Sequence, residues 1–223
     1  DVDNDGDLDV IAGNVGLNNK FSPSETHPLH VFASDFDGNG TNDIVLAKTK
    51  NDELLPVRGR ECSSQQMPFI AQKFATYEAF SKAKLSDVFS PQALKEALHL
   101  QMNQAKSGVF LNESGEFTFF PFPNAAQLSP IKSMLCSDLN ADGFLDVIFI
   151  GNQFNTEVET VRYDAGIGGV LLGDGSGDFV FVDGAKSGLM VPGDAKDLVE
   201  IPWGNRKLLI ATSNNSFLKL FER

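Results

Sequence analysis

Residues 138–146 (DLNADGFLD), followed by the apolar run 147–150 (VIFI), decide the fold of this chain. The same spacing, D-x-[DN]-x-[DN]-G-x-x-D, recurs at residues 1–9 (DVDNDGDLD) and 35–43 (DFDGNGTND). So many carboxylates in one turn repel one another unless a cation holds them. Oxygens at positions 1, 3, 5, 7 and 9 suit a hard cation that takes six or more oxygen ligands. Glycine at position 6 permits the sharp turn that this requires. The pattern therefore predicts three calcium-binding loops, here called loop 1, loop 2 and loop 3 in chain order.

An EF-hand shares the opening of this pattern but differs at its end. It needs a bidentate Glu at position 12 and flanking helices. Position 12 is instead Ala12, Leu46 and Phe149 in the three copies. Apolar, β-branched residues come after each loop, which is strand composition. The predicted unit is a calcium loop that leads into a buried strand.

Charge and hydropathy bound the class of protein. The 223 residues carry 18 basic and 30 acidic side chains, a net charge of −12. The loops alone hold eleven aspartates, so three divalent cations would cancel about half of the imbalance. The sequence has no basic stripe of the kind that phosphates require, which argues against nucleic-acid binding. It also has no apolar stretch of about 18 residues, so no membrane span is expected.

Two further features leave questions open. Cys62 and Cys136 could form a disulfide or both be free. The chain opens on Asp1, inside a calcium loop and without an initiator Met, so a piece of a longer protein is expected and the lack of a signal peptide is uninformative.

The strand-entry pattern repeats along the chain. A degenerate copy begins at Glu200 and keeps the apolar frame over 207–212 without the acidic ligands. Four entry points thus lie near residues 1, 35, 138 and 200. Hairpins are predicted where apolar runs flank a Gly-containing turn, at 109–112 with 117–120 and at 169–172 with 179–182. The glycines at 173–177 have strands on both sides and no Lys-Ser/Thr, so they do not form a phosphate loop. About four strands per repeat predict β-propeller blades.

One segment interrupts the second repeat. Between residues 50 and 106 apolar residues recur at helical spacing, and Ser90-Pro91 is a helix start signal. The spaced residues are Ile70, Phe74, Tyr77 and Phe80, and then Leu94, Leu98 and Met102. An insertion of about two helices within the second blade is predicted. It either caps an apolar surface or shapes a binding site, and in the second case Arg58 and Arg60 would contact anionic groups.

These motifs resemble the FG-GAP/VCBS repeats that form calcium-bearing blades of the integrin α-subunit propeller and of many secreted bacterial proteins. The resemblance covers most of the chain outside 50–106 and implies an all-β propeller. About four blades of a usual seven would be present in one partial domain, 1–223, from the C-terminal part of a secreted protein. It also implies three Ca²⁺ sites with ligands Asp1, Asp3, Asp5, Asp9, Asp35, Asp37, Asn39, Asp43, Asp138, Asn140, Asp142 and Asp146, completed by the backbone carbonyls of Asp7, Thr41 and Phe144.

No catalytic constellation is recognisable. His27, His30 and His99 form no His-Glu-x-x-His and are interpreted as ordinary surface or core histidines, and Gly-x-Ser-x-Gly is absent. The polar segment 155–164 is interpreted as a solvated strand in which Val158 and Val161 alternate with polar residues. The expected function is a non-catalytic, calcium-stabilised module for adhesion or binding of a protein or glycan, in the extracellular space, at the cell surface or in the periplasm. The alternative is the propeller domain of a secreted polysaccharide-acting lyase or hydrolase.

Overall fold

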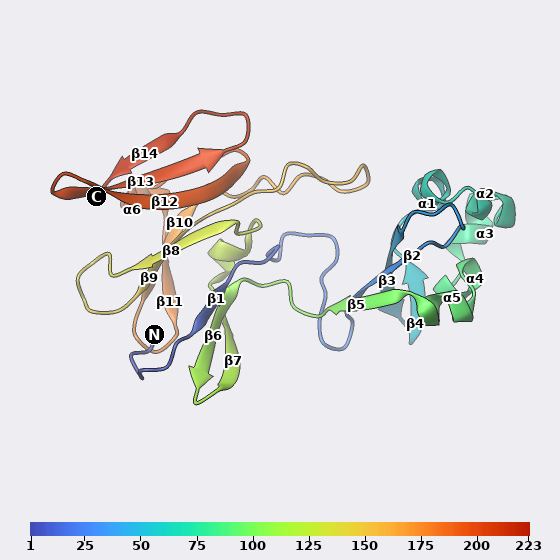
Figure 1. The fold of residues 1–223 in the computed structure, drawn as a ribbon, viewed down its shortest axis with the longest axis horizontal. Coiled ribbons are helices and arrows are strands. Elements are labelled where there is room, and N and C mark those ends of the chain that lie inside the picture. The colour runs from blue at the N-terminus through green and yellow to red at the C-terminus, as the bar shows by residue number, and fades with distance from the viewer. The chain divides into compact units, whose positions relative to one another are not determined.

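The computed structural model describes residues 1–223, and the chain is mostly β-structure in four antiparallel sheets. It divides into two compact units. Unit 1 comprises residues 1–20 and 105–223, and unit 2 comprises residues 21–104. Figure 1 shows the elements of both units.

Unit 1 contains three sheets. Sheet 1 has the order β1-β6-β7, sheet 2 the order β11-β10-β9-β8 and sheet 3 the order β12-β13-β14. The bounds are β1 Val10–Ala12, β6 Gly108–Glu113, β7 Glu116–Pro121, β8 Ser133–Ser137, β9 Asp146–Ile150, β10 Gly169–Gly173, β11 Phe179–Val182, β12 Ala195–Trp203, β13 Arg206–Ser213 and β14 Lys219–Glu222. A 3₁₀-helix, Asn124–Gln127, and the short helix α6, Gly184–Ser187, connect strands. Both predicted hairpins are confirmed, as β6–β7 and β10–β11.

Sheet 1 joins segments that lie far apart in the sequence. Strand β1 pairs with β6 in antiparallel register, with Ile11 opposite Val109. The blue and green strands lie side by side in Figure 1. All of unit 2 is therefore inserted between two neighbouring strands of one sheet. The corresponding connection in sheet 2, between β9 and β10, is residues 151–168.

Strand β9 explains why residues 147–150 are apolar without interruption. All five of its residues are buried. Val147 and Phe149 pack in the core between sheets 1 and 2, with Val109 and Leu111 of β6. Ile148 and Ile150 pack in the core between sheets 2 and 3. Because successive side chains of a strand point to opposite faces, a strand between two cores is apolar at every position.

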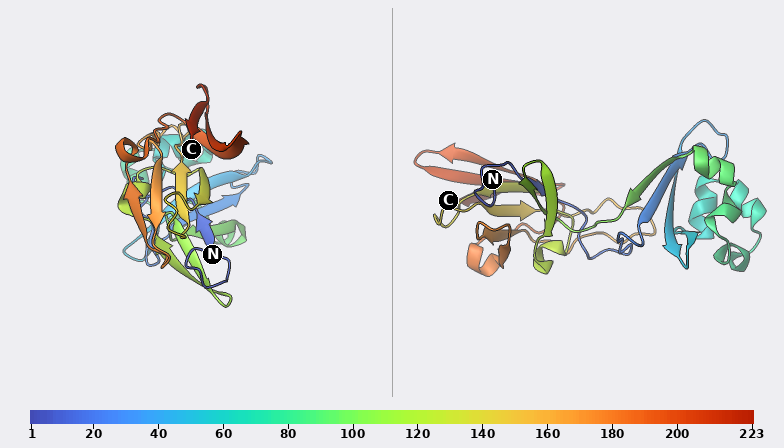
Figure 2. Two further views of the ribbon diagram at one scale, coloured as in Figure 1. Left: turned by 90° about the vertical axis from the view of Figure 1, so that its left-hand side faces the viewer. Right: turned by 90° about the horizontal axis from the view of Figure 1, so that it is seen from below.

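Unit 2 consists of one sheet and five short helices. Its sheet has the order β4-β3-β2-β5, with β2 Leu29–Ser34, β3 Asp43–Lys50, β4 Glu53–Pro56 and β5 Leu98–Met102. The helices are α1 Arg60–Gln66, α2 Phe69–Lys73, α3 Tyr77–Ser81, α4 Leu85–Val88 and α5 Pro91–Glu96. They cover one face of the sheet, as Figure 2 shows, and bury Ile70, Phe80 and Leu85 against Phe32 and Val45.

The predicted insertion 50–106 is helical only between residues 60 and 96. Its two ends are strands β4 and β5, which extend the sheet of loop 2 on opposite sides. The helical interpretation of Leu98 and Met102 is wrong, since both lie on β5. The spacing of Leu94, Leu98 and Met102 resembles a helix because an exposed edge strand need not alternate apolar and polar residues.

Of two other sequence predictions, one is confirmed in part and one is wrong. The strand expected at 207–212 lies within β13, but the degenerate loop that begins at Glu200 has become a tight β12–β13 hairpin with Trp203 opposite Arg206. The strand expected at 155–164 is wrong. Only an isolated bridge between Gln153 and Tyr163 forms there, and Val158 and Val161 are fully or largely exposed.

No helix in the structure has the length and apolar character needed to cross a membrane. Cys136 is a free, exposed cysteine, so it forms no disulfide with Cys62.

Candidate metal centres and an adjoining cationic pocket

The three acidic loops occupy the same place relative to a strand. Loop 2 joins β2 to β3, loop 3 joins β8 to β9, and loop 1 leads into β1. Position 9 is the first residue of β3 and β9, and directly precedes β1. The sequence spacing thus places one loop at the same end of three equivalent strands.

The loops share an unusual backbone. Gly6, Gly40 and Gly143 at position 6 have φ of 101°, 87° and 91°, which confirms the role predicted for glycine there. Position 4 is also left-handed, with φ of 62°, 76° and 62° at Asn4, Gly38 and Ala141. Asn and Gly tolerate this region, whereas Ala does so at a cost. The left-handed conformation at position 4 was not predicted from the sequence. Asn4 and Gly38 are residue types that favour it, but Ala141 is not.

Side-chain oxygens at positions 3 and 5 are oriented by the backbone two residues later. In every loop the N–H of position 5 donates to the side chain of position 3, and the N–H of position 7 donates to that of position 5. The donor–acceptor distances are 3.3 and 2.8 Å in loop 1, 3.2 and 2.8 Å in loop 2, and 3.0 and 2.9 Å in loop 3. Such bonds fix the rotamers of side chains that would otherwise spread into solvent.

Position 1 is held in the same manner in loops 2 and 3. Asp35 accepts backbone N–H bonds of 2.8–3.0 Å from Gly38, Asn39 and Gly40. The bond from Gly40 contributes most to holding the pKa of the Asp35 carboxyl below its ordinary value. Asp138 accepts three equivalent bonds of 2.7–3.2 Å in loop 3. Both side chains are therefore oriented by the backbone of their own loop.

Position 9 anchors each loop to the structure below it. Asp9, Asp43 and Asp146 each accept the N–H of position 2 of their own loop, at 2.6, 3.1 and 2.7 Å. Their second oxygens accept from beyond the loop. Asp9 takes the N–H of Asn112 on β6 and Asp146 that of Gly173 on β10, both at 2.9 Å. Asp43 and Asp146 are buried, with exposed fractions of 3% and 0%. The last aspartate is thus a structural anchor as well as a candidate ligand.

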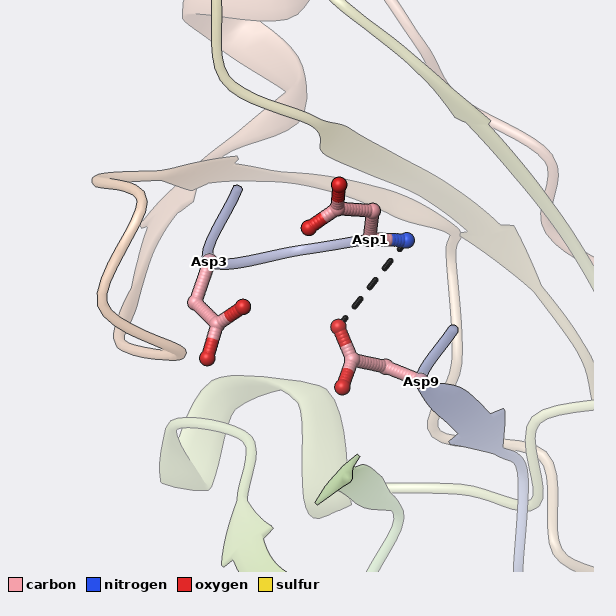
Figure 3. Close-up of side chains that lie close together, drawn as sticks. All are labelled: Asp1, Asp3 and Asp9. Carbon is pink, nitrogen blue, oxygen red and sulfur yellow. Dashed lines mark ion pairs between the residues drawn. The ribbon is translucent and has the colours of Figure 1, made fainter. Parts of the chain in front are cut away.

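In two loops the carboxylates converge on one point. Oxygens of Asp1, Asp3 and Asp9 lie within 4.8 Å of one another, and so do those of Asp35, Asp37 and Asp43. Figure 3 shows the first group, with the terminal amino group of Asp1 3.9 Å from Asp9 Oδ2. Oxygens that bind one Ca²⁺ at about 2.3–2.6 Å lie at most about 5 Å apart, so this spacing fits the ion. Asp1 Oδ1 is also buried without a hydrogen-bond partner, as a cation ligand would be.

Loop 3 has the same backbone but a different charge distribution. The convergent groups use positions 1, 3 and 9, and position 3 of loop 3 is Asn140. Its amide donates to Asp142 Oδ2 at 2.8 Å. Loop 3 therefore gathers fewer negative charges at that point than loops 1 and 2.

Residues at position 7 keep their side chains out of these groups. Asp7 accepts the N–H of Ser114, in the β6–β7 turn, at 2.9 Å. Thr41 donates its hydroxyl to Asn39. The expectation that Asp7, Thr41 and Phe144 contribute backbone carbonyls stays a prediction.

Arg58 and Arg60 line one pocket of about 330 Å³ in unit 2. Lys48 of β3 and Tyr77 of α3 line it as well. Arg60 donates from Nε to the Phe74 carbonyl at 2.6 Å and from Nη2 to the Ala71 carbonyl at 3.3 Å. The sequence predicted a role for the two arginines but not for Lys48. The position of Lys48 at the pocket depends on the β3–β4 hairpin, which no local pattern around Lys48 reveals.

The histidines are not grouped as a metal site, but two of them pair. His30 Nδ1 lies 2.9 Å from His99 Nε2, and His30 Nε2 lies 3.2 Å from Thr49 Oγ1. Burial lowers the pKa of His30, and the charge of His99 lowers it further. His27 is an exposed residue, as expected.

This pair predicts a pH dependence of unit 2. The pKa of His30 is lower in the folded state than its value of about 6.5 in the unfolded chain. Below that pH the unfolded chain therefore binds more protons at His30 than the folded protein does. The stabilisation by neutral His30 is present above that pH and is lost as the pH falls below it. We expect the urea midpoint of unit 2 to fall between pH 7.5 and 5.5. His30→Gln should remove most of this change, whereas the exposed control His27→Gln should keep it. An equal pH dependence in both variants would contradict the assignment.

Comparison with known protein families finds no matching family model, and comparison with curated proteins finds no significant match. The function of the chain is therefore inferred from the geometry of the loops and the pocket.

Proposed function

We propose that this chain is a non-catalytic, calcium-stabilised β-propeller module of the FG-GAP/VCBS type, which binds a protein or glycan outside the cytoplasm. One observation carries the proposal. A loop with the same left-handed positions and the same hydrogen bonds to positions 3, 5 and 9 recurs three times, and in each copy these three side chains are oriented before any ion binds. Preoriented carboxylates repel one another, so the arrangement is favourable only with a cation.

The ion would be held by positions 1, 3, 5 and 9 of each loop, with the carbonyl of position 7. Bound Ca²⁺ would supply positive charge that neutralises the converging carboxylates. Mg²⁺ is a poorer fit because it demands a tighter octahedron and retains its water. Extracellular calcium modules bind with Kd values of about 10⁻⁴–10⁻³ M, far above cytosolic calcium. This supports a location outside the cytoplasm.

The propeller is supported by how sheets 1, 2 and 3 pack. Sheet 2 buries one face against sheet 1 and the other against sheet 3. The outer faces of the two flanking sheets are apolar and exposed. They carry Val10 and Phe117 on sheet 1, and Val199, Trp203 and Leu220 on sheet 3. Neighbouring blades cover such faces in a propeller, whereas a lone stack of sheets would leave them in water.

Calorimetric titration tests the proposal. Protein stripped with EGTA should bind close to three Ca²⁺, and millimolar Mg²⁺ should bind far more weakly. Asp37→Ala, in loop 2, removes a ligand oxygen and should abolish one site while leaving the others. Failure to bind calcium at millimolar concentration would refute the proposed function.

A further inference from the structure

The cationic pocket of unit 2 stands out in an acidic chain. Lys48, Arg58 and Arg60 line it, and no carboxylate does. The whole chain has a net charge of −12, so a concentration of positive charge at one concave site marks a place where an anion is favoured. A volume of about 330 Å³ is at the lower end for small-molecule sites.

The arginine heads are fixed in place. The two carbonyl contacts of Arg60 hold its guanidinium, which lies 5.2 Å from the centre of the Tyr77 ring. Arg58 donates from Nη1 to Gln66 Oε1 at 2.7 Å. A guanidinium held in this manner loses little further freedom when it binds a carboxylate, which it matches in shape.

The rest of the pocket wall is mostly apolar, with Ser81 as its polar residue. Leu55, Pro56, Val57 and Phe80 line it beside the exposed Tyr77. A bare inorganic anion would leave these side chains without a partner, whereas a ring attached to the charged group would cover them. We infer that this pocket binds a small ring-bearing carboxylate, either an acidic sugar or an aromatic acid. The inference rests on the proposed function as a binding module and names its ligand class.

Loop 2 is connected to the pocket by one side chain. Gln66 accepts from Arg58 and donates from Nε2 to Asp43 Oδ1 at 3.1 Å. Asp43 thus lies one side chain from Arg58. The oxygens of Asp35 and Asp37 lie within 4.8 Å of those of Asp43, so loop 2 is within about a Debye length of a bound anion. Without a cation these carboxylates repel it. A cation in loop 2 removes that repulsion, so calcium strengthens carboxylate binding, and the carboxylate strengthens calcium binding by the same factor.

The experiment uses the whole chain and four probes. D-glucuronate and 4-hydroxybenzoate carry the carboxylate on a sugar and on an aromatic ring, and glucose and phenol are their neutral counterparts. Titrations followed by NMR are run with 5 mM CaCl₂, about five times the weakest Kd expected for such loops, and with EGTA. We expect one of the two carboxylates to bind, to bind more weakly in EGTA, and its neutral counterpart not to bind. Which carboxylate binds distinguishes the two sources.

Matched variants assign the binding to this pocket. Lys48→Glu reverses an exposed charge at the pocket and should weaken binding about tenfold or more. Lys95→Glu makes the same change on α5, away from the pocket, and should have no effect. Asp37→Ala, which takes one carboxylate and a cation ligand from loop 2, should reduce the difference between calcium and EGTA.

Three results would overturn the inference. They are binding of neither carboxylate at 10 mM, equal weakening by Lys48→Glu and Lys95→Glu, and identical affinities with calcium and EGTA. The control for the proposed function is separate. If calcium raises the melting temperature while no carboxylate binds, only the inference fails. If a carboxylate binds while calcium leaves the melting temperature unchanged, the proposed function fails.

Discussion

Calcium should raise the melting temperature of both units by on the order of 10–20 °C relative to EGTA. Ligand that binds only the folded state stabilises it by about 2.7 kcal/mol per site at a hundredfold excess over Kd. Loops 1 and 3 belong to unit 1, and loop 2 belongs to unit 2. For domains of this size each kcal/mol shifts the midpoint by several degrees. Differential scanning calorimetry in excess CaCl₂ and in EGTA measures the shift directly.

The assignment of loops to units provides the control. Asp37→Ala removes a ligand of loop 2, so it should reduce the calcium shift of the unit 2 transition and leave that of unit 1. Asp142→Ala removes a ligand of loop 3 and should have the reverse effect. Midpoints that agree to within about 1 °C with and without calcium would rule out structural ions in these loops.

Replacing Asp146 with Ala should destabilise unit 1 by about 3–5 kcal/mol even in EGTA. Asp146 is fully buried, and its two oxygens accept the N–H groups of Leu139 and Gly173. Removing the carboxylate leaves the buried N–H of Gly173 and the partly buried N–H of Leu139 without partners, and each costs about 1–3 kcal/mol. Equilibrium unfolding in guanidinium with EGTA isolates this effect from any loss of calcium.

Position 5 of the same loop supplies the matched comparison. Asp142 is exposed and accepts within its own loop. Asp142→Ala should change stability in EGTA by less than about 1 kcal/mol and should lower the stabilisation by calcium instead. Equal destabilisation by both substitutions in EGTA would show that Asp146 is no anchor.

Local sequence was sufficient for the loops and for the elements that adjoin them. The strands after Asp43 and Asp146, the two hairpins and the glycine at position 6 are all predicted by residues close together in the chain. Their signals are turn geometry and apolar runs, which act over fewer than about ten residues. The helical spacing of Ile70, Phe74, Tyr77 and Phe80 likewise marked a helical region correctly, although it forms several short helices.

The wrong predictions concern segments whose residue spacing is compatible with two different local structures. Leu98 and Met102 fit a helix by spacing but form an edge strand, since β2 offers its free edge to them. Val158 and Val161 alternate as a strand would but are exposed, because no partner strand lies beside them. Burial and strand pairing depend on neighbours that the spacing does not reveal.

The sequence by itself determined that three loops with calcium spacing each lead into an apolar strand, since every residue involved lies within one short segment. Only the tertiary structure decided that Ile11 pairs with Val109 across the whole of unit 2, that Asp9 and Asp146 anchor their loops to β6 and β10, and that Gln66 joins loop 2 to Arg58. These contacts join residues that are far apart in the chain, and nothing in local propensity or periodicity records them. They are set by which sheets pack together and by which buried donors and acceptors must then be satisfied.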